Sequence, residues 1–188
     1  MNKIPVLDKG YVGLLSSSLK GKDIVMLKSL LPRGTANESI LDLPRVHLVI
    51  KCPIFVQTST ANYCTWHKTR DNSLECFIPS INDINARDLQ TSKDIQQAIE
   101  QTTEALMMNP KSFAMDGCDA HIAQCIVPVS AYTTFIATGS LSDWISYINR
   151  EDFPVPVKAY CEAIRQILLA DWNIFRDEIN GKKKERKG

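Results

Sequence analysis

The sequence feature that constrains the fold most is the stretch of residues 46–68, which reads VHLVIKCPIFVQTSTANYCTWHK. Apolar side chains alternate over residues 46–51, and this period of two predicts a strand with one buried face. Pro53 cannot donate a hydrogen bond to a neighbouring strand, so we expect the strand to end near Cys52. Because proline is well tolerated at the start of a helix, a helix is expected to follow directly.

The apolar faces of this junction and of two later segments predict the core. We expect five side chains to be buried: Cys52, Ile54, Val56, Ile126 and Phe135. His47, which alternates along the strand, is expected to be structural.

Hydrophobic periodicity and helix-capping residues predict the remaining elements. We expect strands over residues 4–15 and 132–137, and helices over residues 22–31, 81–89, 91–108, 114–126, 140–148 and 157–179. Asn109 and Pro110 are expected to end the helix over residues 91–108, and Ser140 is expected to cap the helix after the strand at 132–137.

Composition places few limits on function. The chain has 188 residues, with 44% hydrophobic and 23% charged residues, which predicts one globular domain over residues 1–180. A net charge of +1 gives no global electrostatic case for nucleic acid, and we do not expect it as a partner. We find no apolar run near the roughly 20 residues that span a membrane and no signal-peptide pattern, and we expect a cytoplasmic protein. Residues 181–188, GKKKERKG, are expected to form a disordered basic tail.

The six cysteines show no spacing typical of a metal site or a disulfide scaffold. Cys52, Cys125 and Cys161 lie in apolar surroundings. We therefore expect buried free thiols and no metal.

Three stretches carry a family resemblance: HLVIKCPIFV at 47–56, IPVLDKGYVGLL at 4–15, and AHIAQCIVPVSAYTTFIATGSLSDWISYINR at 120–150. Together they resemble the flavin-dependent thymidylate synthases over about residues 4–178. The resemblance implies an α+β fold, with a mixed sheet flanked by helices. It also implies a homo-oligomer, a tetramer with shared active sites. The family uses FAD to convert dUMP to dTMP with methylene-tetrahydrofolate.

The signature that follows the family's Lys-Cys-Pro junction is altered in this chain. The family has an Arg-His-Arg triplet and then Ser-x-Arg. An ungapped register places residues 62–64, Asn-Tyr-Cys, at the triplet, and a register shifted by four residues places Trp66, His67 and Lys68 there. The shifted register, which we prefer, implies that His67 and Lys68 bind the cofactor and that Ser73 binds the substrate. It also places Glu75 opposite the later arginine.

The second half of the chain shows similar losses. Gln124 stands where the family has a nucleotide-binding arginine, whereas Arg150 in Asn149-Arg150 resembles the arginine of the family's closing Asn-Leu-Arg. The resemblance therefore implies that Arg150 binds the substrate phosphate. The alternatives are a solvated loop pair at His67 and Lys68, and a surface ion pair at Arg150. No catalytic residue is assigned.

Three functions compete. The first is a divergent flavin-dependent methyltransferase of pyrimidine deoxynucleotide metabolism, which performs either the family reaction or an altered one on another substrate or one-carbon donor. The second is a catalytically inactive pseudoenzyme that serves as a structural or partner subunit. The third is a purely structural or nucleic-acid-interacting protein that reuses the fold. Because several signature arginines are lost, we expect ordinary thymidylate synthase activity to be weak or absent in this chain alone.

Overall fold

The structure is a computed structural model that describes residues 2–30, 40–69, 75–84, 87–116, 122, 125 and 127–181. The chain forms two compact units. The first comprises Met1–Cys52, Val56–Asp71 and Thr134–Gly188, and the second comprises Pro53–Phe55 and Asn72–Thr133. The single domain expected over residues 1–180 stays a prediction. Beyond Gly181, the expected tail lies outside the described residues.

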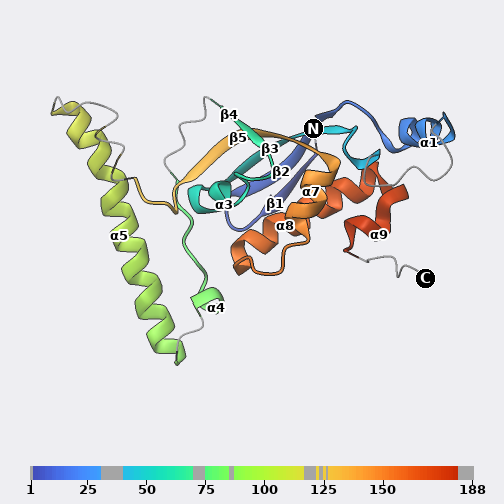
Figure 1. The fold of residues 1–188 in the computed structure, drawn as a ribbon. Coiled ribbons are helices and arrows are strands. Elements are labelled where there is room, and N and C mark those ends of the chain that lie inside the picture. Colours follow the sequence, from blue (N-terminus) through green and yellow to red (C-terminus); the bar gives the residue numbers. More distant parts are fainter. Residues whose placement is uncertain are drawn as a thin grey trace. The chain divides into compact units, whose positions relative to one another are not determined.

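The chain contains a five-stranded sheet with the order β1-β2-β3-β5-β4 (Figure 1). Its strands are β1 (Lys3–Val6), β2 (Gly10–Ser17), β3 (Arg45–Pro53), β4 (Thr65–Lys68) and β5 (Tyr132–Ser140). The pairs β1–β2, β2–β3 and β4–β5 are antiparallel. The family resemblance had implied a mixed sheet. The expected α+β class, with helices beside a sheet, is confirmed.

The helices of the described residues are α1 (Gly21–Leu30), α3 (Ile54–Ser59), α4 (Ile81–Ile84), α5 (Leu89–Met115), α7 (Leu141–Ile148), α8 (Val155–Asp171) and α9 (Arg176–Ile179), with a short 3-10 helix η2 (Asn173–Phe175) between the last two. Helix α8 packs against β1 and β2. None of these helices has the length and apolarity that crossing a membrane requires.

The predicted strand-to-helix junction is confirmed. Strand β3 ends at Pro53 and α3 begins at Ile54. Side chains 46, 48, 50 and 52 of β3 are buried, whereas those between them are partly exposed, as a period of two requires.

Three of the five predicted core side chains are fully buried: Cys52, Val56 and Phe135. Ile54 is partly exposed, because it stands at the first position of α3, where the chain leaves the sheet. Ile126 lies outside the described residues.

The prediction that Asn109 and Pro110 end a helix is wrong, because α5 continues through Pro110 to Met115. A proline inside a helix removes one backbone hydrogen bond. Pro110 is buried, and we infer that the packing of its ring offsets that loss. The separate helix expected over 114–126 starts within α5, and most of it lies outside the described residues.

The single helix expected over residues 157–179 is interrupted at Trp172. This residue has φ −126° and ψ 41°, outside the helical region. Its indole ring is fully buried, and Nε1 donates to the Leu19 carbonyl at 3.1 Å. The helix is therefore interrupted at Trp172, the residue whose ring is buried beside Leu19, which is far away in the sequence.

Gly10→Ala is expected to destabilise the protein by about 2–3 kcal/mol. An added Cβ would lie 1.9 Å from Tyr160 Oη and 2.8 Å from the carbonyl oxygens of Lys51 and Val6. Tyr160 Oη donates to that Lys51 carbonyl at 3.0 Å, so the hydroxyl cannot move without losing its acceptor. Urea unfolding measures the loss. Ser16→Ala, at an exposed position of the same strand, is the control and should change stability by less than about 0.5 kcal/mol.

Candidate functional site

The predicted cofactor residues His67 and Lys68 lie on β4, an edge strand that pairs with β5. Both side chains are exposed. Their partners in the register are Ile136 and Phe135. Neighbouring residues of a strand point to opposite faces of the sheet. His67 and Lys68 therefore do not face one ligand together.

Strand β4 was not predicted from the sequence. Tyr63 and Trp66 follow the apolar start of α3 at about helical spacing, yet α3 ends at Ser59 and Trp66 pairs with Ala137 in the sheet. Pairing with β5 overrides the local helical spacing. The Trp66 ring also packs beside the ring of Phe135, with 6.1 Å between the two ring centroids.

Arg150 lies two residues after the end of α7 and is the predicted site residue with the most defined surroundings. Its Nε donates to Asp152 Oδ1 at 2.8 Å, and its Nη2 donates to Asp152 Oδ2. Its Nη1 donates to Tyr63 Oη at 3.3 Å. The guanidinium carbon lies 5.0 Å from the ring centroid of Phe153, within the range of a cation–π contact.

An aromatic cluster extends from this arginine into the core. Tyr147 is fully buried at its centre. Its ring lies 5.4 Å from that of Tyr63, 5.1 Å from that of Phe153 and 6.2 Å from that of Trp144. Tyr63 and Phe153 are partly exposed. Arg150 therefore stands beside two aromatic rings that a ligand could reach.

Helix α7 places this cluster. Ser140 caps the helix: its Oγ accepts from the Asp143 backbone, and its own backbone N–H donates to Asp143 Oδ2 at 2.9 Å. This capping box confirms the predicted role of Ser140. Trp144 and Tyr147 are three residues apart and share the buried face of α7.

The buried polar groups in and around the cluster stay neutral near pH 7. Tyr147 Oη hydrogen-bonds Ser59 Oγ at 2.9 Å, and burial raises the pKa of Tyr147 well above its ordinary value. Burial also raises the pKa of the Cys161 thiol to about 11 and that of Cys52 further. These groups therefore offer neither a thiolate nor a phenolate at neutral pH. The cluster is suited to binding rather than to nucleophilic attack.

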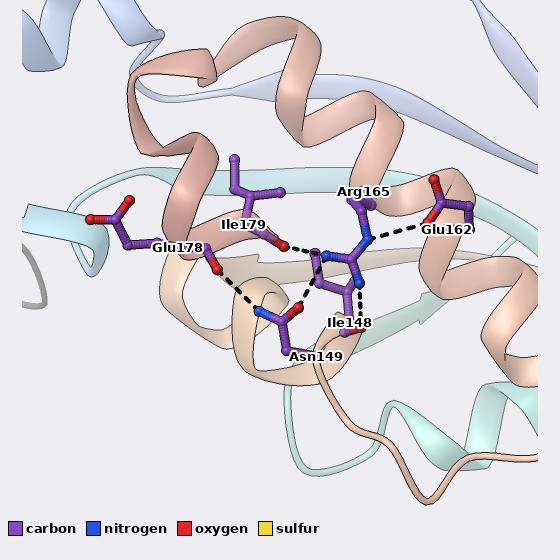
Figure 2. Close-up of polar contacts among 6 residues, drawn as sticks. All are labelled: Ile148, Asn149, Glu162, Arg165, Glu178 and Ile179. Carbon is purple, nitrogen blue, oxygen red and sulfur yellow. Dashed lines mark hydrogen bonds and ion pairs between the residues drawn. The ribbon is translucent and has the colours of Figure 1, made fainter. Parts of the chain in front are cut away.

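Arg165 fixes the point at which the chain leaves α7 towards Arg150 (Figure 2). From α8, its Nη2 donates to the Ile148 carbonyl at 2.9 Å, and its Nη1 donates to Asn149 Oδ1 at 3.0 Å and to the Ile179 carbonyl. Asn149 Nδ2 in turn donates to the Glu178 carbonyl at 3.1 Å. One guanidinium thus joins the C-terminal ends of α7 and α9.

The role of Arg165 was not predicted, although the sequence carries a signal for it. The residue stands four positions after Cys161 and three before Leu168, and both of these are buried. Residues at such spacings share one face of a helix. An arginine on the inner face of a helix requires acceptors, which here are two backbone carbonyls and the side chains of Asn149 and Glu162.

The predicted substrate residue Ser73 lies outside the described residues, and so does Gln124, which stands where the family has an arginine. Glu75 is described, and its carbonyl accepts from the Tyr132 backbone at 2.7 Å. His47 hydrogen-bonds Thr138 through Nδ1 at 2.9 Å, which agrees with the structural role expected for it.

The cysteines agree only in part with expectation. Cys52 and Cys161 are buried free thiols as predicted, whereas Cys125 is exposed. Within the described ranges, no cluster of three or more His, Cys, Asp or Glu side chains is placed to hold a metal ion.

Comparison with known proteins gives matches among solved structures only. No family model and no curated protein matches the sequence. The fold is similar to two crystal structures of the UMP/dUMP methylase PolB from Streptomyces cacaoi, bound with 5-Br UMP and with 5-Br dUMP. The TM-scores are 0.77 and 0.74, at 12% identity over 95% of this chain and 97% of that chain. At this identity the likeness shows a related fold.

Proposed function

We propose that this chain is a thymidylate synthase-like protein that binds a pyrimidine nucleoside monophosphate beside Arg150, Tyr63 and Phe153. The observation that carries the proposal is the Arg150 guanidinium beside two accessible aromatic rings. The guanidinium of arginine can donate two parallel hydrogen bonds to phosphate oxygens, and aromatic rings stack on bases. The fold likeness to a protein named as a UMP/dUMP methylase supports this ligand class.

Within this proposal, the reaction is methyl transfer to the pyrimidine with FAD as cofactor. FAD would supply the hydride, and the chain would supply binding and orientation. His67 and Lys68 do not by themselves fit a flavin diphosphate, because both are exposed on an edge strand and neighbouring strand residues face opposite sides. We derive no catalytic step from them.

A catalytically inactive partner subunit is the second candidate, favoured by one observation. Asp152 already pairs with the Arg150 guanidinium. Incubation with FAD, reduced nicotinamide cofactor, methylene-tetrahydrofolate and dUMP separates the two candidates. Thymidylate formation at the rates usual for the family would contradict the inactive subunit.

Arg150→Ala is expected to weaken dUMP binding by about tenfold or more, because it removes the charged donor for the phosphate. Isothermal titration calorimetry at fixed ionic strength measures the dissociation constant. Arg176→Ala is the matched control, since Arg176 is an exposed arginine of the same unit. Equal dissociation constants for the two variants would contradict a phosphate site at Arg150.

We also propose that the chain forms a homo-oligomer, a tetramer with dihedral symmetry as the family resemblance implies. Light scattering at micromolar concentration tests the assembly, and a monomer there would contradict it. In the inactive-subunit alternative, the chain instead co-purifies with a complete synthase chain.

A further inference from the structure

We propose that the carboxylate of Asp152 occupies the edge of the Arg150 guanidinium that binds the ligand phosphate. The ligand class that displaces this carboxylate is then a dianionic phosphomonoester. The inference rests on the nucleotide-binding function proposed above and adds the residue that determines its selectivity. It assigns Asp152 a role in binding that neither the family signature nor the fold likeness provides.

The contacts of Asp152 resemble those of a bound phosphate. Arg150 presents one edge, Nε and Nη2, to both carboxylate oxygens of Asp152, with 2.8 Å between Nε and Oδ1. This two-point pairing is the geometry with which arginine also binds phosphate oxygens. The other amino group, Nη1, points to Tyr63 Oη at 3.3 Å, and Phe153 lies beside the guanidinium. A ligand phosphate that seeks the same edge must replace the carboxylate.

The pair is also accessible enough to exchange. The side chain of Arg150 is 41% exposed and that of Asp152 is 64% exposed. Exposed ion pairs are weak, because water solvates both partners once they separate. Asp152 can therefore leave the guanidinium without becoming a buried, unpaired charge. The carboxylate competes with the ligand but does not close the site permanently.

Ligand charge then decides which molecules bind. A nucleoside carries no phosphate and cannot compete with Asp152 for the Arg150 guanidinium. A phosphodiester carries one negative charge, as the Asp152 carboxylate does. A phosphomonoester carries close to two negative charges at pH 7 and three acceptor oxygens. The internal carboxylate thus favours nucleoside monophosphates over nucleosides and over nucleic acid strands.

The test compares Asp152→Asn with Glu151→Gln. Both variants remove one negative charge, from neighbouring positions, and keep the side-chain shape. Glu151 is exposed and makes no ion pair within the described part of the chain. Titration calorimetry with dUMP and with deoxyuridine, at pH 7 and fixed ionic strength, gives the dissociation constants of wild type and variants.

We expect Asp152→Asn to tighten dUMP binding by about three- to tenfold and to leave deoxyuridine binding unchanged. Glu151→Gln should change dUMP binding by less than about twofold. Equal gains in the two variants would show a general charge effect and would overturn the inference. Weaker dUMP binding by Asp152→Asn would also overturn it, since Asp152 would then position Arg150 for the ligand.

The same titrations separate this inference from the proposed function. If dUMP binding depends on Arg150 but not on Asp152, the inference alone fails. If neither wild type nor Asp152→Asn binds dUMP, or if binding does not depend on Arg150, the proposed function fails and the inference fails with it. Binding by Asp152→Asn but not by wild type would support both.

Discussion

Replacing Arg165 by methionine is expected to lower the free energy of unfolding by about 3–5 kcal/mol. The guanidinium serves two main-chain carbonyls, of Ile148 and Ile179, and the side-chain oxygen of Asn149. Its side chain is only 20% exposed, so these acceptors have limited access to water once the donor is gone. The C-terminal ends of α7 and α9 lose their common partner.

Equilibrium unfolding in urea measures this change. Arg165→Lys keeps the charge but not the planar fork, and it is expected to lose an intermediate amount of stability. Arg176→Met removes an exposed arginine and should cost less than about 0.5 kcal/mol. Equal losses for Arg165→Met and Arg176→Met would contradict the role assigned to the Arg165 contacts.

Trp172→Ala is expected to destabilise the protein by about 3–5 kcal/mol, the usual cost of removing a large buried aromatic side chain. The indole is fully buried and donates to the Leu19 carbonyl at 3.1 Å. The backbone is closely packed there as well, since a Cβ added at Gly21 would lie 2.7 Å from the Asp171 carbonyl oxygen. The surroundings therefore have little freedom to collapse into the cavity.

Trp172→Phe separates packing from hydrogen bonding. It keeps an aromatic ring but removes the donor to Leu19, and a loss of about 1–3 kcal/mol is expected. Ile174→Ala, two residues away on η2 at a position that is 43% exposed, is the control and should lose less than about 1 kcal/mol. Thermal unfolding followed by circular dichroism compares the three variants. A loss in Ile174→Ala as large as that in Trp172→Ala would contradict the packing argument.

Much of the fold could be predicted because its signals are local. The alternation before Pro53 determines the buried face of β3, and it needs no knowledge of the partner strands. Ser140 and Asp143 form a capping box within one turn, so the start of α7 could also be predicted. Residue types set the available chemistry as well, since an arginine near aromatic residues suits a phosphorylated, planar ligand.

The differences arise where distant parts of the chain compete with local preference. Pro110 stands inside α5 and is buried, Trp172 interrupts a helical run to bury its ring, and residues 65–68 form an edge strand because β5 offers a partner. For Trp172 and residues 65–68, burial or pairing outweighs helix propensity, which differs by only fractions of a kcal/mol between ordinary residues. At Pro110, burial offsets a larger helix penalty of about 3 kcal/mol.

The candidate site depends on tertiary structure still more. The sequence by itself determined that Arg150 resembles a phosphate-binding arginine and that Asp152 stands two residues away. Only the fold brings Tyr63 Oη to 3.3 Å from Arg150, across 87 positions of sequence, and places Arg165 where it holds the end of α7. A hydrogen bond requires donor and acceptor within about 3.5 Å. Sequence spacing says nothing about such a distance until strands and helices have packed.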